Sequence, residues 1–162
     1  MVHLYSGAER LVIISGLYSW LFDTRWSNEA RENIKRLLPR DVTLISTASP
    51  DELAGYWRQF GERAELCRPI FEAMCFTDAA VDYKGSIVKD GQSTTYIYLY
   101  RDAQRSRHSS SVCVFHAAGE AKTLVQLVED ELMRMSNAAH KNEAYVKRKR
   151  ELLQNMRLFA EV

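Results

Sequence analysis

The side chains best suited to chemistry in this sequence are three cysteines and four histidines. Cys113 and His116 are three positions apart, but on an extended strand such positions point to opposite faces, so they do not meet on one metal ion. Structural zinc sites carry paired Cys-x2-Cys or His-x3-His spacings, which the sequence lacks. We therefore expect Cys113 to be a buried thiol, and we predict no metal site and no cofactor.

A catalytic cysteine needs a histidine base within hydrogen-bonding reach. The fold could bring Cys67 or Cys75 to His108 or His116, but nothing in their spacing selects one of these pairs. Cysteines in apolar segments are ordinarily buried and inert. The sequence therefore leaves a cysteine–histidine pair open without favouring it.

Two carboxylates, Asp78 and Asp82, lie near the start of an expected strand. They have the chemistry of an acid–base pair, but the same spacing is typical of turn and strand-edge residues. A phosphate-binding glycine loop, a Gly-x-Ser-x-Gly nucleophile elbow and a His-Glu-x-x-His zinc motif are all absent from the sequence. We therefore assign no catalytic residue and expect a protein that is not an enzyme, with a small hydrolase or transferase as the residual alternative.

The net charge of the chain is only +1, but basic residues are concentrated in two segments, around 105–107 and over 147–150. Lysine and arginine clusters bind nucleic-acid phosphates by releasing counterions. However, four consecutive basic residues wrap around a helix, and pairing with Glu151 would leave them on an ordinary solvated face. A nucleic-acid-binding regulator is therefore the alternative function, and it would use Arg105, Arg107, Lys147, Arg148, Lys149 and Arg150.

A β-hairpin is predicted around Asp90 and Gly91, because a two-residue Asp-Gly turn supplies the positive φ angles that tight hairpins need. This turn pairs Ile87 with Thr94, and the pairs farther from the turn follow from it. A third strand, over 109–117, completes an antiparallel meander.

The second strand of this hairpin carries Tyr96, Tyr98 and Tyr100 on one face, since successive side chains alternate between faces. One interpretation buries this row under helices, with the hydroxyl groups reaching the edge. The other leaves it exposed as an aromatic surface for a protein partner, because tyrosine is enriched in interfaces. The glycine-aromatic signature of an RNA-recognition sheet is missing.

The remaining segments are mostly helical in pattern. An apolar segment over 7–22 predicts a buried helix, with a short strand over 10–15, ended by Gly16, as the competing interpretation. A helix over 27–38 stops before Pro39, and Ser49 with Glu52 forms a capping box for the next helix. A further helical segment over 62–76 is expected to kink or restart at Pro69. The patterns over 120–135 and 144–162 predict a long C-terminal helical segment, either broken or continuous between them.

These elements predict one α+β domain over 1–162: N-terminal helices, a three-stranded antiparallel meander, and the C-terminal helical segment. Residues 41–46 are a candidate fourth strand at an edge. Hydrophobic residues make up 46% and charged residues 27% of the chain, which is typical of a globular protein. An odd number of cysteines, and an apolar stretch over 11–22 that is too short for a bilayer and wrongly flanked for a signal peptide, indicate a cytoplasmic protein.

The amphipathic stripe of the C-terminal segment is longer than a three-stranded sheet can cover, and uncovered apolar stripes usually pack against a partner. We therefore expect a regulatory or adaptor protein that acts through protein–protein binding, with a homodimer as one form of it. No membrane partner and no small-molecule substrate are indicated. The residues predicted to bind the partner are Tyr96, Tyr98, Tyr100, Tyr145, Leu152, Met156 and Phe159.

Overall fold

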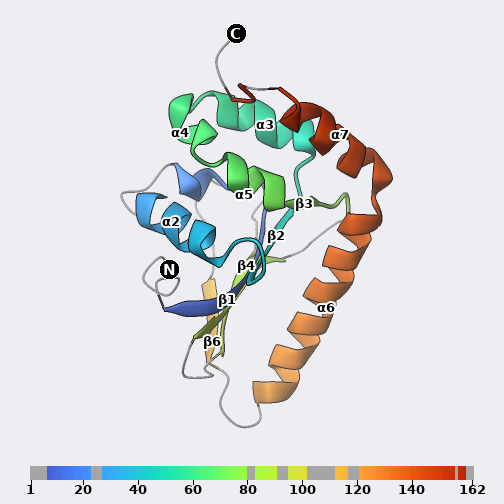
Figure 1. Ribbon diagram of the computed structural model, residues 1–162. Helices are drawn as coiled ribbons and strands as arrows, with labels where there is room; N and C mark the ends of the chain where they lie inside the picture. The colour runs from blue at the N-terminus through green and yellow to red at the C-terminus, as the bar shows by residue number, and fades with distance from the viewer. Residues whose placement is uncertain are drawn as a thin grey trace.

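The chain was analysed as a computed structural model, which describes residues 7–22, 27–79, 83–90, 95–101, 112–116, 121–155 and 157–159. Helices and strands are mixed in these ranges, so the predicted α+β class is confirmed. Within the same ranges, no helix has the length and apolar character needed to cross a membrane. Six described strands form one sheet in the order β3-β2-β1-β4-β5-β6 (Figure 1). Their bounds are Ala8–Ser15 (β1), Val42–Ser46 (β2), Cys75–Phe76 (β3), Tyr83–Asp90 (β4), Thr95–Arg101 (β5) and Val112–His116 (β6).

The segment predicted as an N-terminal helix over 7–22 is instead the central strand β1, so that prediction is wrong and the competing strand interpretation is the right one. Leu11 and Ile13 are buried on one face of the sheet, and Ile14 is buried on the other. A strand covered on both faces reads as a continuous apolar run, which periodicity cannot distinguish from a buried helix. Within the described segment 7–22, helical structure is limited to a short 3-10 turn after β1, η1 (Ser19–Leu21).

The candidate fourth strand, β2, is present, but it lies inside the sheet and runs parallel to both of its neighbours, β1 and β3. The sheet is therefore mixed, not a purely antiparallel meander with an added edge strand. Parallel neighbours require crossover connections, and helices supply them. The first crossover is α2 (Ser27–Leu37), and the second contains α3 (Pro50–Arg58), α4 (Glu62–Glu65) and α5 (Arg68–Ala73).

The sequence located these crossover helices well. The Ser49 hydroxyl accepts a hydrogen bond from the Glu52 amide at 3.2 Å, and the Glu52 carboxylate accepts one from the Ser49 amide at 2.8 Å, which confirms the capping box. The helical segment after α3 restarts with Pro69 in the first turn of α5, as predicted, but it ends at Ala73, and Cys75–Phe76, predicted to be helical, form strand β3. Gly61, at φ 51°, allows the sharp turn between α3 and α4 that other residues resist.

The three-stranded antiparallel meander is confirmed as β4, β5 and β6, but the predicted hairpin register is wrong. Ile87 lies opposite Ile97, not opposite Thr94. Asp90 belongs to β4, where it pairs with Ala8 of β1, and so it is not a turn residue. Pairing with β1 therefore extends β4 beyond the point at which the Asp-Gly signal would end it.

The C-terminal segment is divided into α6 (Ala121–Lys141) and α7 (Glu143–Leu153). The break lies at Asn142, whose side-chain oxygen accepts a hydrogen bond from the Tyr145 amide at 3.2 Å. In Figure 1, α6 runs along one side of the sheet, and α7 turns back over α3. This break therefore places the two C-terminal helices in different parts of the fold.

Among the residues that the structure describes, the two faces of the sheet carry core clusters of different size. On one face, the sheet residues Leu11, Ile13, Leu44 and Val88 belong to a cluster with α2, α3, α5 and Leu152 of α7, which we call the major core. Its aromatic members are Tyr18, Phe22, Trp57, Phe71, Phe76 and Phe159. On the other face, Ile14 and Ile45 of the sheet and Met135 of α6 form a smaller buried cluster among the described residues, which we call the minor core.

Candidate functional site

A groove lies between α6 and the minor-core face of the sheet, and it encloses a cavity of about 170 Å³. Helix α6 packs against β2 and β3, at one end of the sheet order, and the groove lies between its first half and the neighbouring strands β1 and β4. The sheet contributes Arg10, Val12, Thr43, Ile87 and Lys89 to its lining, and the helix contributes Gln126, Asp130, Met133 and Ser136.

The groove has an apolar floor and charged walls. Ile87 is buried in the floor, whereas Met133 is 51% exposed, a high value for so apolar a side chain. Arg10 and Lys89 are directly paired across β1 and β4, so the sheet wall concentrates positive charge. On the helix wall, Asp130 accepts a hydrogen bond of 2.7 Å from the side-chain amide of Gln126. The two walls therefore differ in charge.

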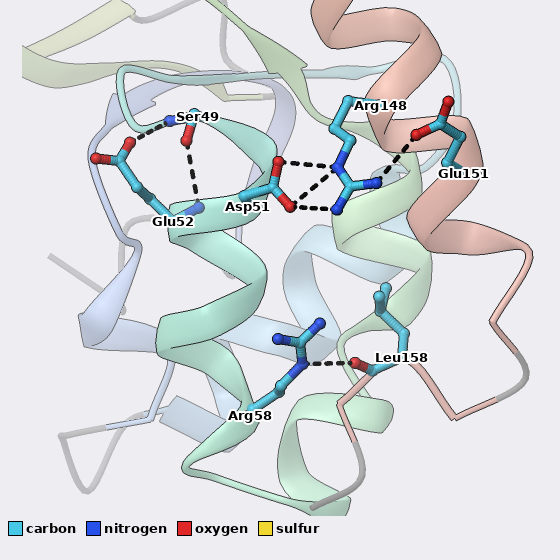
Figure 2. A network of polar contacts seen from close by, with 7 residues as sticks. All are labelled: Ser49, Asp51, Glu52, Arg58, Arg148, Glu151 and Leu158. Carbon is cyan, nitrogen blue, oxygen red and sulfur yellow. Dashed lines mark hydrogen bonds and ion pairs between the residues drawn. The ribbon is translucent and has the colours of Figure 1, made fainter. Parts of the chain in front are cut away.

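The basic run of α7, predicted as a nucleic-acid-binding segment, is partly used inside the molecule. Figure 2 shows Arg148 between two carboxylates: its guanidinium donates to Asp51 of α3 at 2.7 Å and to Glu151 at 3.0 Å. The hydrogen bond from Arg148 lowers the pKa of Asp51, and the same contact raises the pKa of Arg148. This pair joins α7 to α3.

The neighbouring Lys149 is also engaged. Its ammonium donates to the carbonyl oxygens of Glu72 and Met74, both at 2.9 Å, and its burial lowers its pKa. Lys147 and Arg150 are exposed. The run thus wraps around the helix, with two of its four cations binding other parts of the chain. Arg105 and Arg107 lie outside the described residues, so the loop half of the nucleic-acid prediction stays untested.

The C-terminal residues predicted to bind a partner mostly fill the chain's own core. Phe159 is fully buried against Trp57 and Phe71, and Leu152 is 7% exposed. Tyr145 is partly buried against the same major core. The stripe is therefore covered by α3 and α5, which removes the reason for assigning these side chains to a partner. Met156 lies outside the described residues.

The tyrosine row lies in β5, as predicted. The backbone register places Tyr96 opposite Val88, Tyr98 opposite Ser86 and Tyr100 opposite Lys84. The side chains of the three tyrosines are outside the described part of the structure, so their exposure stays a prediction.

The carboxyl ends of the parallel strands are a second candidate site, because open sheets commonly bind ligands there. The Ser46 hydroxyl lies 2.9 Å from the Gly16 carbonyl oxygen and accepts a hydrogen bond from the Ala48 amide at 3.1 Å. The ammonium of Lys84 lies 3.2 Å from the place that a side chain at Gly16 would occupy. These contacts hold the strand ends together and fill the space between them.

The structure brings Cys75 of β3 to His140 of α6, a pairing that sequence reasoning missed. The sulfur lies 3.3 Å from Nε2 and 3.6 Å from Nδ1 of the imidazole. Cys67 is buried, and its burial raises the pKa of the thiol to about 11. In the described part of the chain, no three histidine, cysteine or acidic residues gather as a metal site would require.

The other residues considered for chemistry are not brought together. Cys113 and His116 lie in β6, and their side chains are outside the described part. Asp78 is exposed, and Asp82 and His108 lie outside the described residues.

Of these candidates, the groove alone combines an open cavity with apolar and charged lining residues. Comparison of the chain with protein-family models, with curated proteins and with solved structures found no match. The features of the chain that bear on its function are therefore the groove and the cysteine–histidine pair.

Proposed function

We propose that this protein is a non-enzymatic regulatory or adaptor protein that binds a segment of a partner protein in the groove between α6 and the sheet. The observation that carries this proposal is the groove itself: an apolar floor of Val12, Ile87 and Met133, with cations on one wall. Protein interfaces typically combine an apolar anchor pocket with a polar rim, and methionine is enriched in them.

The size of the cavity supports a side chain as its occupant. Pockets for drug-sized ligands and cofactors span roughly 300–1,000 Å³, whereas this cavity is about 170 Å³. A single apolar side chain of a bound segment suits such a space better than a nucleotide or a cofactor does. This is also the reason for proposing binding in preference to catalysis.

The charges favour a particular kind of segment. Arg10 is exposed at the groove, and Lys89 lies opposite it on β4. A carboxylate next to the anchoring side chain would be attracted by both cations. We therefore expect the partner segment to carry an acidic residue beside a large apolar one.

The free thiols of Cys67 and Cys75 support a reducing compartment, and the cytoplasm remains part of the proposal.

A random peptide library displayed on phage tests this function directly. Selection on the folded protein should enrich peptides with an acidic residue next to a large apolar residue. Synthetic versions of these peptides should bind the wild-type protein, as measured by fluorescence anisotropy. Binding should weaken at least about tenfold in Arg10→Glu and in Met133→Asp, because each substitution removes one half of the recognition.

Leu66→Asp is the matched control, since Leu66 is another apolar residue that is 59% exposed but is not among the groove residues. It should leave binding unchanged. Enriched peptides without the expected pattern, or equal binding by the groove variants, would contradict the proposal. Light scattering distinguishes the other occupant: a wild-type dimer that Met133→Asp converts to a monomer would replace the foreign segment with a second copy of this chain.

A further inference from the structure

Three chemically active side chains from three elements meet at the end of the sheet. Cys75 lies in β3, His140 in the last turn of α6, and Lys149 in the middle of α7. The Cys75 sulfur is 3.3 Å from Nε2 of His140, within hydrogen-bonding distance for a thiol. Lys149 is anchored on the carbonyl oxygen of Met74, the residue before Cys75, at 2.9 Å. Cys75 is therefore a thiol with a base and a cation beside it.

We propose that Cys75, His140 and Lys149 form a thiol modification site that exchanges with the disulfides of small thiols. The proposal is independent of the groove and of its partner. It follows from the pairing of a nucleophile with a base within reach, which a buried structural cysteine lacks.

The exchange balances as a single displacement. His140 accepts the proton of the Cys75 thiol, and the sulfur attacks one sulfur of the small disulfide. A new S–S bond forms between Cys75 and that sulfur while the S–S bond of the ligand breaks. The released thiolate takes the proton back from the His140 imidazolium. Cys75 is oxidised, and the departing half of the disulfide is reduced to a thiol.

The charges around Cys75 explain why the base is needed. Burial raises the pKa of Cys75, and the positive charge of Lys149 opposes that rise. The thiol is therefore not already ionised by its surroundings, so removal of its proton depends on a neighbouring base. Burial lowers the pKa of Lys149, and the negative charge of Glu72, joined by that of Cys75 once the thiol is ionised, opposes this fall. Lys149 thus stabilises the thiolate once His140 has taken the proton.

The pair is accessible from the solvent. His140 is exposed and Cys75 is half-buried, so the pair lies at the surface with the thiol partly covered. Cys67 is the natural contrast, because it is fully buried in the major core, and its pKa is raised to about 11. Of the two cysteines whose side chains the structure describes, Cys75 thus has a histidine base beside it, whereas Cys67 is enclosed in the major core.

The proposal is tested by incubating the folded protein with glutathione disulfide at neutral pH and following the mixed disulfide by intact mass and peptide mapping. We expect the adduct on Cys75, and no adduct on Cys67 while the protein remains folded. In His140→Ala the rate should fall at least about tenfold, because a positioned base typically contributes about 10²–10⁴-fold. Alkylation by neutral iodoacetamide should show the same dependence on His140.

Cys75→Ser should abolish the adduct, and Cys67→Ala should leave its rate unchanged. Lys149→Met should slow the reaction by a smaller factor, with circular dichroism confirming that the variant is folded. Because His140 partly covers the thiol, a mere packing contact predicts the opposite result, namely faster labelling when the ring is removed. Equal or faster modification of His140→Ala, or an adduct on Cys67 in the folded protein, would overturn the proposal.

Discussion

The two faces of the central sheet are built in opposite ways. On the major-core face, aromatic rings from distant segments pack together. The ring of Trp57, for example, contacts the rings of Phe22, Phe71 and Phe159. On the opposite face, the buried cluster among the described residues is limited to Ile14, Ile45 and Met135, and a groove remains beside it. Among the described residues, the major-core face thus carries the larger cluster, and the opposite face carries the groove.

Polar contacts follow the same division. Polar contacts join the C-terminal segment to the major-core side. Arg148 forms an ion pair with Asp51, and Arg68 donates a hydrogen bond to the Asn155 carbonyl oxygen. The Glu65 carboxylate accepts a hydrogen bond from the Phe159 amide at 2.7 Å. On α6, the ion pair of Glu131 with Arg134 stays within the helix. In the function proposed above, the major-core face supplies stability and the groove on the other face binds the partner.

The largest effect is expected when the major core loses an aromatic ring. Phe159→Ala should lower the free energy of unfolding by about 3–5 kcal/mol, because it removes a fully buried ring and leaves a cavity. Urea unfolding measures this loss. Met133→Ala, at an exposed groove position, should change stability by no more than about 0.5 kcal/mol. Similar losses in the two variants would break the comparison.

Two neighbours on β2 compare the faces directly. Leu44 belongs to the major core and Ile45 to the minor core, and both are almost fully buried. Leu44→Ala should cost about 3–5 kcal/mol, and Ile45→Ala about 2–3 kcal/mol, because a small cluster beside a groove can collapse more easily around a cavity. Denaturant midpoints with unchanged slopes would provide both values. A larger loss of unfolding free energy in Ile45→Ala than in Leu44→Ala would contradict the prediction that the major core is the more rigid of the two.

A smaller effect is expected at the start of α3, which carries Trp57 into the major core. Ser49→Ala removes the hydroxyl that accepts from the Glu52 amide, and it should lower stability by about 1 kcal/mol. Thermal unfolding measures this change. Ser49→Asp serves as the control, since aspartate caps helices as well as serine does, and it should retain wild-type stability.

The smallest effect concerns the ion pair between α3 and α7. Because Arg148 lowers the pKa of Asp51 from 3.8, the pair stabilises the fold above that pH, and its contribution is lost as the pH falls through the lowered value. Asp51→Asn should therefore be slightly less stable than wild type at neutral pH, and the difference should vanish in strong acid. The pair is solvent-exposed, so salt should also reduce the difference. A difference in melting temperature that persists in acid would show that the charge of Asp51 is not its cause.

The sequence was most informative where local signals act alone. The capping box at Ser49 and Glu52, the restart at Pro69 and the alternation of the tyrosine strand depend on neighbours within a few residues, and the structure has these elements where they were expected. The helix predicted over 7–22 is wrong because a strand buried on both faces of a sheet lacks the alternation of apolar and polar residues that identifies a strand. The predicted hairpin register is wrong because Asp90 pairs with Ala8 of β1, a strand far away in sequence, and so continues β4.

The candidate sites required tertiary structure. The groove joins Arg10 and Lys89 of the sheet to Met133 of α6, and no spacing along the chain connects them. Cys75 and His140 are 65 residues apart, so their pairing has no signature in the sequence. The basic run was a visible signal, but only the fold shows that Arg148 and Lys149 bind within the chain.

Amide hydrogen exchange, with and without a peptide selected on the folded protein, tests the division between the faces most directly. Binding in the groove should slow exchange in the segments of α6, β1 and β4 that line it, around 126–136, 10–12 and 87–89. Exchange in α3 and α7 should stay as it is in the free protein. Protection that appears over α3 and α7 and leaves α6 unchanged would contradict the account.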